Sequence, residues 1–475
     1  MRKKHLIRRI CSFLLSFTIL FFMIPLASLR SDGDANVSSD EQPPVLQNPV
    51  EGLLDPSPSG LPIPGADSYL VYDVLSDTML IGYQYETPKA PSAITQIMTV
   101  LLALENLELS DMITITEDMY DSIPDDYVRI GFSEGEVVTV EQCIYACLLK
   151  SANDACLALA ITMSGSESAF VERMNQRAAE LGCTNTHFTN SYGLSDGEHK
   201  TTCRDMSLIL KETLRHPDFT KISTCTSYTI EPTNTFNDRR ILNNANRFIS
   251  TPSTAYEYYI GGKTGYSSES GYTIIAGAEK DGRTLIGILL GANDAENRYL
   301  ALSELFEYCF TNYTTTMIEE NEMSGVVKNT TSQIENSILG TNLKISGTSL
   351  KIIEYYSVLT SIANGGYSND IDLSGVVIDP LAKTQELKLP INRTFSNNDS
   401  YIIGYLTVTI VDETRMDEEP ENVASTSEKK DRSDILLTVA IVTGLLLVSG
   451  LAILLFLKML KKRRFHKNHR NPRIL

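Results

Sequence analysis

The chain has 475 residues, 42% of them hydrophobic and 21% charged, which is the composition of a globular protein with room for two or three domains. Its formal net charge is −18, and all 59 acidic residues lie between Asp32 and Asp434, whereas 13 of the 41 basic residues lie at the two ends. Such an acidic body repels nucleic acid, so no nucleic-acid partner is expected.

The first 65 residues are predicted to precede the folded body. A basic start leads into an apolar run over residues 10–29 that ends in small residues, which is typical of a secretory signal. We predict a signal peptide, or an uncleaved signal anchor, over residues 1–29. Residues 30–65 are rich in Pro, Ser, Gly and Asp and are predicted to be a linker.

Strands and helices are predicted to mix in the region that follows. Alternating apolar residues indicate strands, and longer runs with apolar spacings of three and four indicate buried helices. A polar Glu-Lys-Asp-Gly turn at 279–282 predicts a hairpin. The predicted strands are 68–73, 79–83, 272–278 and 284–291, and the predicted helices are 94–107, 140–164, 166–181 and 295–310.

The character of the chain changes after residue 312. Residues 313–335 are predicted to be a linker, and short alternating strands between Gly, Asn and Asp turns predict a small all-β domain over residues 336–411. The acidic, polar residues 412–434 are predicted to form a stalk.

A membrane anchor is predicted to follow the stalk. Residues 435–457 carry no charge, and a helix of this length reaches about 34 Å, which is enough to cross a bilayer core. The tail at 458–475 is basic from its start, so the positive-inside rule places it in the cytoplasm. We therefore expect a single-pass protein of the cell membrane whose body is extracytoplasmic.

Cysteine and histidine do not indicate a metal or cofactor site. Apart from Cys11 the body holds seven Cys, whose spacings match no metal motif, so we expect small core residues with at most one or two disulfides. Only His187, His199 and His216 lie in the body, which favours neither a metal site nor a Ser-His-Asp triad. No cofactor is expected.

Two short motifs stand in a specific order downstream of the helix predicted at 94–107. The first is Ser151-Ala152-Asn153, and the second is Lys263-Thr264-Gly265, which opens the predicted hairpin region. Either triplet alone is more often structural than catalytic. Their order and their contexts together make the pair a specific signal.

With these motifs the sequence resembles the low-molecular-mass penicillin-binding proteins, the S11 peptidase family of serine-type D-alanyl-D-alanine carboxypeptidases. The resemblance runs from about residue 66 to 310 and includes the stretches 97–105, 170–175, 186–190 and 262–266. It implies a β-lactamase/transpeptidase-like α/β domain over residues 66–312, with an antiparallel sheet flanked by helices. It also implies peptidoglycan stem peptides ending in D-Ala-D-Ala as partners, and a weaker resemblance covers about 330–411.

The family's third motif, SxxK, is degenerate in this chain. In the family a Ser attacks the D-Ala-D-Ala carbonyl and a Lys three residues later accepts its proton. The family-like residues Ile97-Met98-Thr99 fix the register, so that Ala93 occupies the nucleophile position and Gln96 the lysine position. Ser92 is a poor substitute, because one residue along a helix turns the side chain about 100° away from its neighbour, and because the i+3 residue of Ser92 is Thr95, not Lys.

The resemblance also assigns roles to the remaining cleft residues. Ser151 and Asn153 would line one side, while Lys263 and Thr264 would face the carboxylate that ends the stem peptide. The backbone N–H groups of Ala93 and Tyr266 would form an oxyanion pair that needs no side chain. The further expected binding residues are Gly265, where the ligand backbone can approach closely, and Arg298, at the place of a carboxylate-binding Arg.

Three functions remain open at this point. The first is a pseudoenzyme that binds stem peptides or regulates wall synthesis without cutting. The second is an active D-alanyl-D-alanine carboxypeptidase that uses Ser92 or an unusual nucleophile, and the third is a structural or interaction ectodomain. Ala93 and Gln96 favour the first function over the second, and the intact Ser-Ala-Asn and Lys-Thr-Gly motifs favour it over the third.

Overall fold

The computed structural model describes residues 64–415. The predicted signal segment, nearly all of the linker after it, most of the stalk, the apolar run at 435–457 and the basic tail lie outside the described residues. Within residues 64–415, no helix is both long enough and apolar enough to cross a membrane. We refer to residues 64–312 as the N-terminal region and to residues 313–415 as the C-terminal region.

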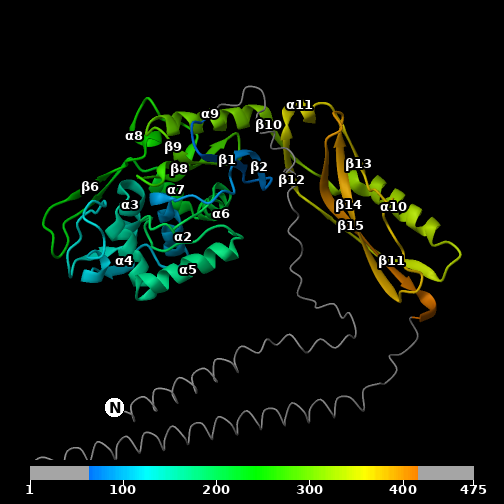
Figure 1. Ribbon diagram of the computed structural model, residues 1–475, viewed down its shortest axis with the longest axis horizontal. Helices are drawn as coiled ribbons and strands as arrows, with labels where there is room; N and C mark the ends of the chain where they lie inside the picture. The colour runs from blue at the N-terminus through cyan, green and yellow to red at the C-terminus, as the bar shows by residue number, and fades with distance from the viewer. Residues whose placement is uncertain (1–63, 416–475) are drawn as a thin grey trace, which may run out of the picture. The chain divides into compact units, whose positions relative to one another are not determined.

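The N-terminal region is built on one antiparallel sheet of five strands in the order β2-β1-β9-β8-β7 (Figure 1). The four strands predicted here are confirmed, each within two residues at its ends. β7, which was not predicted, forms the edge of the sheet and carries the Lys-Thr-Gly motif. The strands are β1 (Ser68–Asp73), β2 (Thr78–Tyr83), β7 (Tyr259–Ser267), β8 (Gly271–Lys280) and β9 (Arg283–Ala292).

Helices cover both faces of this sheet (Figure 1). On one face, apolar residues of α2 such as Ile97 and Leu101 share a core with Ile288 of β9. On the other face, Leu302 and Phe306 of α9 pack in a second core. The predicted antiparallel sheet flanked by helices is therefore confirmed. The helices of this region are η2 (Ser92–Thr95), α2 (Gln96–Asn106), η3 (Glu117–Met119), α3 (Val140–Lys150), α4 (Asn153–Ser164), α5 (Glu167–Glu180), α6 (Cys203–Thr213), α7 (Pro217–Ser223), α8 (Arg247–Ser250) and α9 (Asn297–Asn312).

The single helix predicted over residues 140–164 is wrong in one respect, because the structure divides it into α3 and α4. Ser151 adopts a left-handed backbone conformation with a φ of 58°, and this ends α3. α4 begins two residues later at Asn153. The apolar periodicity continues through the break and hides it from sequence analysis. The break places the Ser-Ala-Asn motif at a helix–helix turn, where its polar side chains can face a cleft.

Two small hairpin-like pairs complete the N-terminal region. They are β3 (Met112–Thr114) with β4 (Val137–Thr139), and β5 (Ser227–Ile230) with β6 (Arg240–Asn243). Six of the seven cysteines in the described residues are buried, and all seven are free thiols. They act there as small core residues, as the sequence indicated.

The C-terminal region contains a four-stranded antiparallel sheet in the order β11-β15-β14-β13 and a two-stranded pair of β10 with β12. The four-stranded sheet buries Leu389, Leu406 and Val408 in a core of its own. The elements are β10 (Tyr313–Met317), η4 (Glu320–Met323), α10 (Ser324–Ser337), β11 (Leu343–Ile352), β12 (Tyr355–Leu359), α11 (Thr360–Ala363), β13 (Tyr367–Asp370), β14 (Thr384–Phe395), β15 (Ser400–Asp412) and η5 (Glu413–Arg415).

Two predictions for this region need correction. Residues 313–335 were predicted to be a linker, but they form β10, η4 and most of α10. The small domain was predicted to be all-β, but Ile334 of α10 and Ile338 behind it belong to the core of the sheet. The helix was missed because its apolar residues are few and are separated by Asn, Thr and Ser, which have low helix propensity.

Candidate functional site

A cleft of about 510 Å³ lies where β7 meets the turn between α3 and α4. It contains seven of the nine residues that the sequence singled out, and Gln96 and Lys263 lie buried behind its wall. The residues that line it are Ser92, Ala93, Asp126, Tyr127, Val128, Ser151, Asn153, Tyr192, Gly193, Thr264, Gly265, Tyr266, Ser267, Ser268 and Arg298.

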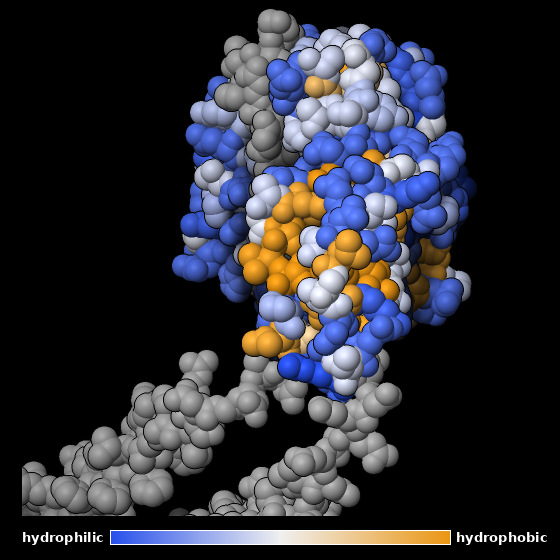
Figure 2. Space-filling view, turned by 90° about the vertical axis from the view of Figure 1, so that its right-hand side faces the viewer, coloured by the Kyte–Doolittle hydropathy of each residue, from blue (hydrophilic) through white to orange (hydrophobic). Residues whose placement is uncertain are grey.

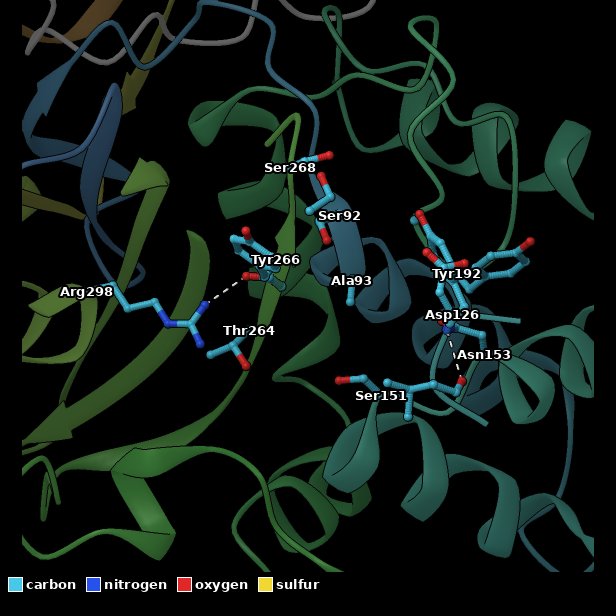
Figure 3. A pocket seen from close by; sticks show the side chains of 15 residues that line it. Ser92, Ala93, Asp126, Ser151, Asn153, Tyr192, Thr264, Tyr266, Ser268 and Arg298 are labelled. Carbon is cyan, nitrogen blue, oxygen red and sulfur yellow. Dashed lines mark hydrogen bonds between the residues drawn. The ribbon is translucent and has the colours of Figure 1, made fainter. Parts of the chain in front are cut away.

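Ala93 lies at the point of the cleft where the sequence placed the nucleophile. It belongs to η2, the short turn that leads into α2. Figure 3 shows its methyl group pointing towards Ser151 and Asn153, with no oxygen at this position. The hydroxyl group of Ser92, whose backbone is left-handed with a φ of 53°, points to the other side, towards Ser268. The geometry therefore does not make Ser92 a substitute for the missing side chain.

Two glycines hold the peptide that joins Ser92 to Ala93. A Cβ atom at Gly265 would lie 2.8 Å from the backbone nitrogen of Ala93, so β7 packs directly on this turn. On the other side, a Cβ atom at Gly193 would clash with the carbonyl group of Ser92, and Gly193 has a φ of 99°. The backbone N–H of Ala93 is thus fixed next to Gly265, the residue that precedes Tyr266.

We predict that Gly193→Ala destabilises the protein clearly more than Gly197→Ala does. Both glycines have positive φ, but a Cβ at Gly197 would meet nothing within 4 Å. The control therefore carries only the backbone strain, about 1–2 kcal/mol. The clash with Ser92 should add about 1–3 kcal/mol. Thermal or urea unfolding of the two variants measures this difference, and equal losses of stability would show that the Ser92–Ala93 turn is not held as described.

Gln96 is fully buried, and its side-chain amide faces only acceptors. Its Nε2 donates to Oδ1 of Asn153 at 3.0 Å and lies 3.4 Å and 3.5 Å from the carbonyl oxygens of Ser151 and Tyr192. Its Oε1 has no hydrogen-bond partner among the described residues. Burying Oε1 without a hydrogen-bond donor costs free energy. A side chain that carries only donors would bond the same three oxygens and leave no buried acceptor without a partner. The pocket at position 96 therefore suits a lysine ammonium better than the amide it contains.

The ammonium group of Lys263 lies behind the wall of the cleft, next to Ser151. The ammonium group of Lys263 donates to Oγ of Ser151 at 2.5 Å and to the carbonyl oxygen of Thr264 at 2.8 Å. Only 2% of Lys263 is exposed, and this burial lowers its pKa to about 8. The nearby guanidinium group of Arg298 also lowers the pKa. The charge at this position can therefore be changed within an accessible pH range.

Asn153 and Asp154 fix the loop that forms the opposite wall, and neither Asp154 nor this loop was predicted to contribute. Nδ2 of Asn153 donates to the carbonyl oxygen of Val128 at 3.0 Å, a bond drawn in Figure 3. The carboxylate of Asp154 accepts hydrogen bonds from the backbone N–H groups of residues 130–132. Asp126 and Tyr127 reach the cleft through this loop. The only sequence signal was the position of Asp154 directly after the Ser-Ala-Asn motif.

Arg298 lies against the outer side of β7. Its Nη1 donates to the carbonyl oxygens of Gly265 at 2.8 Å and Thr273 at 3.0 Å, which links α9 to the edge of the sheet (Figure 3). Its buried Nε has no hydrogen-bond partner among the described residues. Together with Lys263 it makes this end of the cleft positive, beside the hydroxyl group of Thr264. Such an end can bind a carboxylate through charge-assisted hydrogen bonds.

Two comparisons of the sequence agree on one group of proteins. A family model described as D-alanyl-D-alanine carboxypeptidase (peptidase S11) matches residues 60–294. The D-alanyl-D-alanine carboxypeptidase DacF of Bacillus subtilis is 34% identical over 233 residues, which are 48% of this chain and 57% of that protein. The carboxypeptidase DacB2 of Mycobacterium tuberculosis is 31% identical over 240 residues, which are 49% of this chain and 78% of that protein. The chain thus spans little more than half of the Bacillus protein.

A comparison of structures extends the likeness beyond the N-terminal region. The crystal structure of the D-alanyl-D-alanine carboxypeptidase DacD from Francisella tularensis matches with a TM-score of 0.57 and 19% sequence identity. The match covers 76% of this chain and 98% of that one. At this identity the likeness shows the fold alone. It supports the β-lactamase/transpeptidase-like fold predicted from the sequence.

Proposed function

We propose a function for this chain from the premise that it belongs to the peptidase S11 family of D-alanyl-D-alanine carboxypeptidases. In this proposal it is a member without carboxypeptidase activity, which binds peptidoglycan stem peptides ending in D-Ala-D-Ala and thereby regulates wall synthesis. One observation carries the proposal: Ala93 faces the cleft at the nucleophile position and has no oxygen to attack a carbonyl.

The rest of the cleft supports binding without cleavage. Lys263, Thr264 and Arg298 offer a positive end for the terminal carboxylate of the peptide. The N–H groups of Ala93 and Tyr266 do not depend on the lost side chains, so they can still polarise a peptide carbonyl. A weak affinity, on the order of 1 mM to 1 μM, is consistent with a few charge-assisted bonds of this kind.

The test of this proposal is calorimetric titration of the chain with a stem peptide ending in D-Ala-D-Ala, followed by mass analysis of the peptide. The expected result is saturable binding with the peptide left intact. Release of the terminal D-Ala would favour the active enzyme instead. Absence of both binding and cleavage would favour a structural or interaction ectodomain.

We further propose that residues 435–457 tether the protein to the cell membrane, with the body extracytoplasmic and Leu475 in the cytoplasm. The support is the uncharged run of 23 residues and the basic residues that follow it. Protease added to intact wall-stripped cells should digest the body and leave a tag behind Leu475 intact. Digestion of the tag would contradict this orientation.

Binding should weaken as the pH rises through about 8. Burial lowers the pKa of Lys263 to about 8, so its ammonium group is charged below that pH and neutral above it. The terminal carboxylate of the peptide stays charged throughout, so only the partner on the protein changes. Titrations at several pH values measure the effect, with Lys263→Met as the control, for which the profile should be flat over this range. If the affinity of the Lys263→Met variant fell by the same factor over this pH range, Lys263 would be excluded as the source of the pH dependence.

A further inference from the structure

One end of the C-terminal region exposes large apolar side chains. Leu339, between α10 and β11, is 83% exposed, and in the loop that leads into β14 Val377 is 83% and Leu381 is 70% exposed. These are the three most exposed large hydrophobic residues in the part of the chain that the structure describes. Figure 2 shows hydrophobic side chains gathered over the middle of the face of the C-terminal region that is turned to the viewer. Apolar side chains grouped on a surface usually mark a site that contacts another protein or a membrane.

The same end is where the described chain leaves the domain. The strand register pairs Leu343 with Asp412 and Thr384 with Val411, so β11 and β14 both begin where β15 ends. The guanidinium group of Arg415 donates to the carbonyl oxygen of Leu381. Leu339 lies four residues before the start of β11 and Leu381 three residues before the start of β14. We call this end, with Leu339, Val377 and Leu381, the exit end.

The sequence beyond Arg415 indicates what covers the exit end. Residues 416–434 separate it from the apolar run at 435–457, and 19 residues reach at most about 65 Å even when fully extended. A bilayer that holds residues 435–457 is therefore within reach of the exit end at high effective concentration. The intervening segment is itself acidic and polar, so it is a poor cover for exposed leucines.

Basic residues at the exit end fit the same occupant. Lys344, Lys383 and Arg415 lie in or next to the first or last residues of the elements that meet there. Lys344 pairs with Glu413, and Arg415 pairs with Asp412. The carboxylate of Asp379 accepts a hydrogen bond from the backbone N–H of Leu381, so acidic and basic residues balance at the exit end, and the cations lie beside its apolar side chains, as in interfacial segments.

We propose that the exit end rests on the lipid bilayer, with Leu339, Val377 and Leu381 inserted at the boundary between headgroups and acyl chains. The inference rests on the membrane tether proposed above, and it is independent of peptide binding in the cleft. Docking would hold the C-terminal region against the membrane surface. We assign the exit end to contact with lipid and not with a second copy of the chain, because the tether holds the exit end close to the bilayer.

The absence of tryptophan in all 475 residues permits a direct test. The full chain carrying Leu381→Trp is reconstituted into vesicles of phosphatidylcholine and phosphatidylglycerol, with and without brominated acyl chains. The matched control is Ile241→Trp on β6, an apolar residue that is 62% exposed in the N-terminal region and shares the same tether. The expected result is blue-shifted emission and loss of most of the fluorescence to the brominated lipid at position 381, and neither at position 241.

A second variant separates docking from proximity. Leu339→Ser and Val377→Ser in the Leu381→Trp chain change exposed residues and leave the core intact, and they should clearly weaken the quenching.

If the protein floats with vesicles but quenching is equal at positions 381 and 241, the docking is overturned and the tether stands. Failure to float would overturn both. A blue shift without quenching, together with dimers in sedimentation, would identify a second copy as the occupant and overturn the proposal, and peptide titration in parallel reports on the cleft separately.

Discussion

Restoring both reacting groups, with Ala93→Ser and Gln96→Lys in one chain, is expected to produce a protein that is acylated by penicillin. The two positions lie three residues apart where η2 leads into α2, so the hydroxyl and the ammonium groups would share one face. Nε2 of Gln96 contacts three acceptors, the carbonyl oxygens of Ser151 and Tyr192 and Oδ1 of Asn153, and these could also accept from a lysine ammonium. The gain over the natural chain should be several powers of ten, since such groups act as a unit.

The single variants are the controls for this experiment. Ala93→Ser alone supplies a hydroxyl without a base, and Gln96→Lys alone supplies a base without a nucleophile, so neither should be acylated at a comparable rate. The rate of adduct formation is followed by intact mass. A folded but inert double variant would mean that the Ser-Ala-Asn and Lys-Thr-Gly motifs persist in this chain only as packing.

Lys263→Ala is expected to weaken binding of a stem peptide ending in D-Ala-D-Ala by about tenfold or more, since a charge-assisted hydrogen bond contributes about 1.5–3 kcal/mol. Lys263 is buried behind the wall of the cleft, where solvent screens its charge little. The loss should be smaller for a peptide whose C-terminus is amidated, because the amide carries no charge. Calorimetry with both peptides measures the two losses.

Two further variants serve as controls. One tests whether the loss of affinity comes from the charge of Lys263 or from its volume, and the other tests whether removing any lysine has the same effect. Lys263→Met keeps most of the side-chain volume, so a similar loss there assigns the effect to charge and not to a collapsed cleft. Lys351→Ala removes an exposed lysine from β11 in the C-terminal region and should leave affinity unchanged. Equal losses for the free and the amidated peptide would contradict recognition of the carboxylate by Lys263.

Much of the fold of the N-terminal region could be predicted because its signals are local. The strands at 68–73 and 284–291 carry dense apolar runs, and Asp281-Gly282 between β8 and β9 has the positive φ angles that a tight hairpin requires. The break at Ser151 could not be predicted, because one left-handed residue does not interrupt an apolar pattern. α10 was missed for the opposite reason, since its apolar stripe is too sparse to stand out.

The sequence predicted the site residues that belong to short motifs. It did not predict those that loops from distant parts of the chain bring to the cleft. Ala93, Ser151 and Lys263 were found through the register of three motifs. In the structure Ala93 and Ser151 line one cleft, and Lys263 lies behind its wall next to Ser151. Gly193 and Tyr127 come from loops without any motif, and only the folded chain shows that they close the cleft. Oε1 of Gln96 has no hydrogen-bond partner within residues 64–415, and this too depends on the three-dimensional surroundings of the side chain.

Incubation of the natural protein with a labelled β-lactam tests most directly whether this chain lacks the nucleophile of its family. After incubation the intact mass of the protein is measured, and any label is mapped to a peptide. We predict an unchanged mass, because Ala93 has no oxygen to acylate and Ser92 points away from Ser151 and Asn153. A stoichiometric increase in mass that maps to Ser92, Ser151 or another serine of the cleft would contradict the loss of the nucleophile.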